Sequence, residues 1–136
     1  GNRIVGPAAY SGAAPFAGGP SALERLDRDV LSLAGVTAVV WFEGINDLSA
    51  GESPDAIIDG LKEGVRRMRA HHRALRILGA TITSSLGATS ASGTPEIDAR
   101  RQAINTFIRT GGLFDDVADF DKATRETASS CSMAAR

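Results

Sequence analysis

The chain has 136 residues, 43% of them hydrophobic and 23% charged, with a net charge of -1 at neutral pH, which is typical of one soluble globular domain. This charge balance excludes a dedicated nucleic-acid binder, which needs a basic surface, and no run approaches the roughly 20 apolar residues of a transmembrane segment. The single cysteine, Cys131, excludes an intramolecular disulfide and a thiolate metal cage, and leaves the compartment, cytoplasmic or secreted, undetermined.

The first elements are a loop and a helix. Residues 1–20 are so rich in glycine and proline that they predict neither helix nor strand. Ser21 and Glu24 then have the spacing of a capping box, in which their side chains satisfy the free N–H groups of a helix start. Apolar residues at helical spacing follow as far as Gly35. The sequence therefore predicts a first helix over about residues 21–34.

A buried strand comes next, over residues 36–43, because this run is apolar and rich in β-branched residues. It stops abruptly at Gly44, Asn46 and Asp47. In open α/β sheets, ligands bind beyond the carboxyl ends of the strands. We therefore expect residues 44–47 to lie at a functional site.

The remaining elements alternate between helix and strand. The pattern predicts a helix from Ser53 to about His72, a strand over 75–82, a loop over 83–93, a helix from Thr94 to the Gly111–Gly112 stop, and a short strand over 116–121. The expected inward residues are Ile57, Ile58, Leu61, Val65 and Met68 in the earlier helix and Ile97, Ile104, Phe107 and Ile108 in the later one. The alternation predicts a parallel sheet with right-handed crossovers and helices on both faces.

The tetrapeptide Gly44-Ile45-Asn46-Asp47 resembles the third sequence block of the SGNH/GDSL hydrolases, a family of esterases and lipases. The order of elements agrees with that family, since a glycine- and proline-rich loop, a capped helix and an apolar strand precede the motif. In addition, Gly1-Asn2-Arg3 is similar to the end of the family's second block. The resemblance covers about residues 1–124 and leaves residues 125–136 as an unmatched tail.

The resemblance implies an α/β/α three-layer fold of the flavodoxin-like SGNH type and carboxylic-ester hydrolysis without a metal or other cofactor. It assigns the oxyanion hole to the Asn46 amide and the Gly1 backbone N–H, with Gly44 and Asp47 completing the motif. Small-molecule esters or lipids would be the substrates. The family's serine block and Asp-x-x-His block have no match, so we expect an incomplete domain that lacks the nucleophile, acid and base.

Several polar residues have simpler structural interpretations. Asn46 also fits an ordinary turn after a strand, and Asp47 fits a residue that orients the loop through backbone N–H groups. The two histidines, His71 and His72, fall at the end of a helix, away from the predicted site. The serines outside any nucleophile motif are expected to be solvated loop residues: Ser11, Ser49, Ser84, Ser85, Ser90 and Ser92.

Two further groups have both a functional and a structural interpretation. The basic run around the histidines fits an anion or membrane-surface patch, but a solvated helix face is favoured because no aromatic residues interleave with the charges. Its members are Lys62, Arg66, Arg67, Arg69, Arg73 and Arg76. Trp41 and Glu43 either line a pocket or pack at the sheet edge.

Two other functions stay open from the sequence. The first is a catalytically silent fragment or interaction module, because the nucleophile and base blocks are unmatched. The second is a flavodoxin-like ligand binder, although no phosphate-binding loop follows a strand here. In the fold that the resemblance implies, the strand carrying residues 38–42 would lack the neighbouring strand that precedes the catalytic serine, which predicts a homo-oligomer through the exposed sheet edge.

Overall fold

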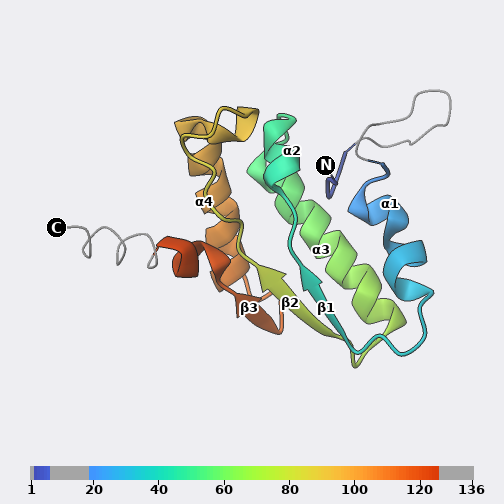
Figure 1. Cartoon of the computed structure of the whole chain (residues 1–136). Helices are drawn as coiled ribbons and strands as arrows, with labels where there is room; N and C mark the ends of the chain where they lie inside the picture. Colours follow the sequence, from blue (N-terminus) through green and yellow to red (C-terminus); the bar gives the residue numbers. More distant parts are fainter. Residues whose placement is uncertain (1, 7–18, 126–136) are drawn as a thin grey trace, which may run out of the picture.

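The computed structural model describes residues 2–6 and 19–125, which form a three-stranded sheet with helices packed against it (Figure 1). The predicted loop over residues 1–20 lies mostly outside this part. The elements in chain order are α1 (Ala22–Leu26), β1 (Ala38–Trp41), α2 (Ile45–Ser49), α3 (Pro54–His71), β2 (Arg76–Ala80), α4 (Pro95–Thr110) and β3 (Asp116–Ala118). Helix α3 and helix α4 are the two long elements, and each connects two neighbouring strands.

The sheet is parallel, with the strand order β1-β2-β3. Both crossovers step across the sheet in the same direction, and right-handed crossovers of this kind place their helices on one face. Accordingly α3 contacts α4 on one side and α1 on the other. The predicted α/β class is confirmed. Because α1, α3 and α4 form one layer, the described residues make an incomplete version of the three-layer arrangement.

The long helices begin where the sequence predicts them. Ser53 caps α3 by accepting a hydrogen bond from the backbone of Ala56, and Pro54 occupies the first turn, where its missing N–H costs nothing. Thr94 and Pro95 start α4 in the same way. The predicted stripe of α3 is buried, apart from the half-buried Ile58. In α4, Ile104 and Ile108 are buried, whereas Ile97 and Phe107 are half-buried.

The first helix is shorter and less regular than predicted. The capping box of Ser21 and Glu24 is present, but α1 ends at Leu26 and continues as a π-helical turn over Asp27–Leu31. The Ser32 N–H donates to the carbonyl of Asp27, five residues back, which is the hydrogen bond of a π-helix. Gly35 then reverses the chain with a positive φ of 78°.

Other boundaries also differ from the prediction. The strand predicted over 36–43 is regular only over Ala38–Trp41, and the strand predicted over 75–82 only over Arg76–Ala80. The third strand ends at Ala118 and residues 120–125 are helical. The reason is Asp119, whose carboxylate accepts the N–H of Lys122 and thereby starts a helical turn.

The core lies between the sheet and the helical layer. Six of its side chains have no exposed surface, and they come from the N-terminal segment, α2, α3, β2 and α4: Ile4, Leu48, Ile57, Met68, Ile77 and Ile104. In the part of the chain that the structure describes, no helix has the length and apolarity needed to cross a membrane.

Strand β1 lies at one end of the sheet and pairs only with β2 within the described residues. Side chains alternate along a strand, so Trp41 packs toward α3 while Val40 points to the opposite face. Val40 is 57% exposed and Phe42 is 50% exposed. An apolar strand with an unpaired edge is a template for pairing with another chain.

We expect the chain to self-associate through the β1 edge. Light scattering should show a dimer or larger species, and a Val40→Lys variant should be monomeric, because a lysine on an edge strand opposes pairing. Leu86→Lys, which places the same charge at a 56% exposed site in the loop after β2, should leave the species unchanged. A parent chain that is monomeric at NMR concentrations would contradict the prediction.

Candidate functional site

The residues singled out by the sequence lie at the carboxyl end of β1. Gly44 separates the strand from α2, and its φ of 128° is a conformation that side chains rarely adopt. A Cβ at this position would also lie 2.8 Å from the Ile82 side chain. Glycine is therefore required here for its backbone conformation, and a larger residue would also displace the end of the Ile82 side chain. The sequence predicted that these residues follow the strand but missed the five-residue helix α2 that carries them.

Asn46 lies in the first turn of α2 and is exposed. Its Nδ2 atom donates to the carbonyl of Asn2 at 2.9 Å. An amide nitrogen carries two hydrogens, and Asn2 is the one partner of Nδ2 among the described residues. The amide is thus held by one hydrogen bond and keeps a second N–H that no described residue accepts. This arrangement can donate to a negatively charged oxygen of a bound molecule.

Asp47 is fully buried and holds the N-terminal segment. Its carboxylate accepts the Ile4 N–H at 2.9 Å and the Val5 N–H at 3.0 Å. These are the backbone bonds that the sequence interpretation expected, and they come from residues more than forty positions away. Burial raises the pKa of Asp47 above its usual value, although the bonds from Val5 and Ile4 act in the opposite direction.

The structure therefore brings residues 2–5 and the 44–47 motif together, as expected if both belong to one site. Gly1, the second residue assigned to the oxyanion hole, lies outside the described residues. Its neighbour Asn2 contacts Asn46 directly.

The serines of the described residues engage groups that do not activate a nucleophile. The Ser84 hydroxyl donates to the Asp98 carboxylate at 2.9 Å, Ser85 and Ser49 donate to backbone carbonyls, and Ser90 bonds with Ser92. None of these hydroxyls is hydrogen-bonded to a histidine. Ser11 lies outside the described residues.

The histidines are far from the motif in the topology. His71 ends α3 and His72 follows it, with their rings 4.5 Å apart. Helix α3 runs back from the carboxyl end of β1 to the start of β2. Its last residues therefore lie near the amino ends of the strands, opposite the carboxyl end that carries Asn46. No cluster of three or more metal-ligating side chains occurs in residues 2–6 and 19–125.

The basic run forms ion pairs on the solvated side of α3 and β2. Five of its six members pair with carboxylates: Lys62 with Asp59, Arg66 with Glu63, Arg67 with Asp27, Arg69 with Asp115 and Arg76 with Asp116. These pairs offset five of the six positive charges of the run. The arrangement agrees with a solvated face rather than an anion-binding patch.

Trp41 and Glu43 contribute to a cavity of about 280 Å³ between α1 and the free edge of β1. The indole Nε1 donates to Glu43 at 3.1 Å, and Arg25 pairs with the same carboxylate at 2.6 Å. Burial raises the pKa of Glu43 despite the nearby Arg25 guanidinium. The sequence left open whether these residues line a pocket or pack at an edge, and they do both.

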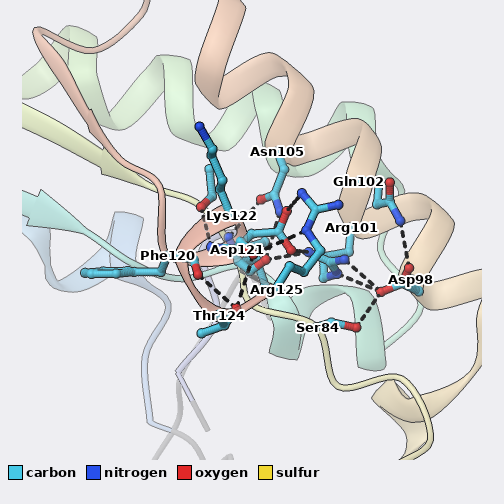
Figure 2. A network of polar contacts seen from close by, with 12 residues as sticks. Ser84, Asp98, Arg101, Gln102, Asn105, Phe120, Asp121, Lys122, Thr124 and Arg125 are labelled. Atoms are coloured by element: carbon cyan, nitrogen blue, oxygen red, sulfur yellow. Dashed lines mark hydrogen bonds and ion pairs between the residues drawn. The ribbon is translucent and has the colours of Figure 1, made fainter. Parts of the chain in front are cut away.

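A buried network of charged and polar residues was missed by the sequence analysis (Figure 2). Arg101 of α4 is 2% exposed and pairs with Asp98 at 2.8 Å and with Asp121 at 2.7 Å. Asn105, one turn further along α4, binds both the N–H and the carbonyl of Ile82 at 2.8 Å. The available signal was the spacing of Arg101 and Asn105, which interrupts the apolar stripe of α4 at positions that face inward.

A family model described as the GDSL-like lipase/acylhydrolase family matches residues 1–132. No curated protein matches the chain significantly.

Proposed function

Since the chain belongs to the GDSL-like lipase/acylhydrolase family, a family of hydrolases, we propose that Asn46 binds the oxyanion formed when a carboxylic ester is hydrolysed. The observation that carries this proposal is the setting of the Asn46 amide. It is exposed at the carboxyl end of β1 and fixed by Asn2, and one of its N–H groups has no acceptor among the described residues.

The chemistry needs a donor of this kind. When a serine hydroxyl attacks an ester carbonyl, the carbonyl oxygen gains negative charge in the tetrahedral intermediate. A donor that is already oriented stabilises this charge without reorganising during the reaction, and removal of one such donor costs about 2.7–4 kcal/mol in the transition state. The hydrogen bond from Asn46 to Asn2 supplies that prior orientation.

A second donor is proposed at Gly1. The family resemblance assigns its backbone N–H to the same oxyanion, and its chain neighbour Asn2 lies against Asn46. Two donors from separate segments would then face one oxygen. Carboxylic esters of small molecules or lipids are the proposed substrates.

The proposal assigns no nucleophile or base within the described residues. Their serines outside the helix caps bond to carboxylates, carbonyls or another serine, and the histidines lie at the distant end of α3. We propose that this chain supplies the oxyanion side of the reaction, within residues 1–124 as a partial SGNH-type domain.

The test is a fusion protein in which a Gly-Asp-Ser-Leu-type block precedes residue 1 and an Asp-x-x-His block follows the domain. Asn46→Ala should lower kcat for a short-chain p-nitrophenyl ester by about 10²-fold, with KM little changed, because an oxyanion donor acts mainly in the transition state. Ser49→Ala in the same helix α2 serves as the control and should leave kcat unchanged. An Asn46→Ala variant with the kcat of its parent would remove Asn46 from the reaction.

A catalytically silent interaction module is the second candidate, favoured by the engaged serines and by the exposed apolar edge of β1. The fusion protein distinguishes the two. The unfused chain should hydrolyse the same ester no faster than a denatured control under both hypotheses. Only the fusion protein of an oxyanion-binding chain should gain turnover that depends on Asn46.

A further inference from the structure

Asp47 is a buried carboxylate whose partners are distant in sequence. It has no exposed surface, and both of its oxygens lie 2.9 Å from the Ile4 nitrogen. Burying a charge is costly unless hydrogen bonds satisfy it, and a carboxylate that accepts backbone N–H groups forms bonds of the stronger, charge-assisted kind. The bonds that Asp47 accepts from Ile4 and Val5 therefore fix the N-terminal segment in one particular position.

That segment is also held from its other sides. The Arg3 carbonyl accepts the Ala22 N–H at 2.7 Å, which ties it to the start of α1. The Ile4 and Val5 side chains pack so closely on Gly60 of α3 that a Cβ there would overlap them. Residues 2–5 thus lie between α1, α2 and α3, and Asp47 provides the contact from α2.

The neighbouring residue on α2 contacts the same segment. Asn46 donates to the Asn2 carbonyl at 2.9 Å, two residues before Ile4. Two adjacent side chains of one helix thus bind one short stretch of backbone, one as acceptor and one as donor. Movement of Ile4 away from Asp47 would carry the Asn2 carbonyl away from Asn46.

We propose that Asp47 is a positioning residue for Asn46: its bonds to the Ile4 and Val5 N–H groups set the Asn2 carbonyl, which in turn orients the Asn46 amide. The relevance to catalysis rests on the proposed function of Asn46. The coupling itself rests only on the hydrogen bonds between α2 and residues 2–5, and it is measurable in the chain without any reaction.

The charged groups near Asp47 matter for a measurement that follows its ionisation. Arg3 favours the ionised form, and Glu43, whose own pKa is raised by burial, is affected by the charge of Asp47. Glu43→Gln is therefore included as a parallel sample, so that titration of Glu43 is not mistaken for that of Asp47.

The experiment uses the 15N-labelled chain in solution NMR. In the parent, the backbone amides of Ile4 and Val5 and the side-chain amide of Asn46 should titrate together, with one pKa above the ordinary aspartate value, and this should persist in Glu43→Gln. In Asp47→Asn the titration should vanish from all three, and the Asn46 amide should shift toward the position of a free asparagine. Asp59→Asn, an exposed carboxylate on α3, should change none of them.

A parent chain in which Ile4 and Val5 titrate while the Asn46 amide does not would overturn the proposal, even if every Asp47 variant failed to fold. The fusion protein separates this outcome from failure of the proposed function. If Asn46→Ala leaves kcat unchanged while the NMR coupling is present, the catalytic role of Asn46 is ruled out, but the positioning of its amide by Asp47 is supported. If Asn46→Ala slows the reaction, Asp47→Asn should lower kcat by about 10-fold or more and should add little to the Asn46→Ala loss.

Discussion

Asp121→Ala should lower the free energy of unfolding by about 3–5 kcal/mol, because removing one partner of a buried ion pair leaves an uncompensated charge. Asp121 is 1% exposed and accepts from Arg101, Arg109 and Arg125 at 2.7–2.8 Å. Without it, Arg101 keeps the Ile82 carbonyl and Asp98, which places the loss toward the lower end of the range. Urea unfolding followed by the fluorescence of the single tryptophan measures the change.

The matched control is Asp59→Ala. Asp59 also pairs with a cation, Lys62, but both side chains are more than half exposed, and such surface pairs contribute only about 0–1 kcal/mol. An Asp121→Ala variant no less stable than Asp59→Ala would mean that the buried network is not a source of stability.

The same cluster sets an expected dependence of stability on pH. The Arg109 hydrogen bond lowers the pKa of Asp119, and for Asp121 the bonds from Arg109 and Arg101 outweigh the effect of burial and also lower it. A lowered folded-state pKa stabilises the fold above the unfolded value of about 4, and this contribution is lost as pH falls toward the folded value. Loss of stability between neutral pH and pH 3 should therefore be smaller in Asp121→Ala.

Local signals in the sequence predicted the elements with good accuracy. The capping box at Ser21, the Ser53–Pro54 and Thr94–Pro95 starts and the apolar run into Trp41 each depend on residues close together in the chain. Nearest-neighbour chemistry decides such features, so one sequence suffices to find them. The parallel sheet followed because helices and strands alternate.

Features that depend on distant partners were not predictable in the same way. Arg101 and Asn105 are polar, so the pattern of apolar residues predicts that they lie on the solvent-facing side of α4. Both are buried, because Asp121 and Ile82 complete their hydrogen bonds. Helix α2 is too short to show periodicity. The N–H group that Asp47 accepts from Ile4 lies 43 residues away in the chain. The sequence predicted that Asp47 binds backbone N–H groups, but it could not identify which residues donate them.

Trp41→Ala should cost about 3–5 kcal/mol of stability, the usual range for removing a large aromatic side chain from a core. Trp41 is 7% exposed, and its ring lies directly on the backbone of α3 at Gly64. A methyl group at Gly64 would overlap the six-membered ring. The absence of a side chain at Gly64 thus allows the sheet to approach the helix. Because variants without the tryptophan lose its fluorescence, their unfolding is followed by circular dichroism.

The contact between Trp41 and Gly64 predicts a change of sign in a double mutant. Alone, Gly64→Ala should destabilise the protein, since overpacking costs about 1–3 kcal/mol and exceeds the gain of up to about 1 kcal/mol from replacing glycine in a helix. In the Trp41→Ala background the overlap is gone, so Gly64→Ala should stabilise. Ala103→Gly at an exposed position of α4 reports helix propensity alone and should cost about 1 kcal/mol in both backgrounds. If Gly64→Ala had the same effect on stability with and without Trp41, the contact with the indole ring would not be the reason that this position requires glycine.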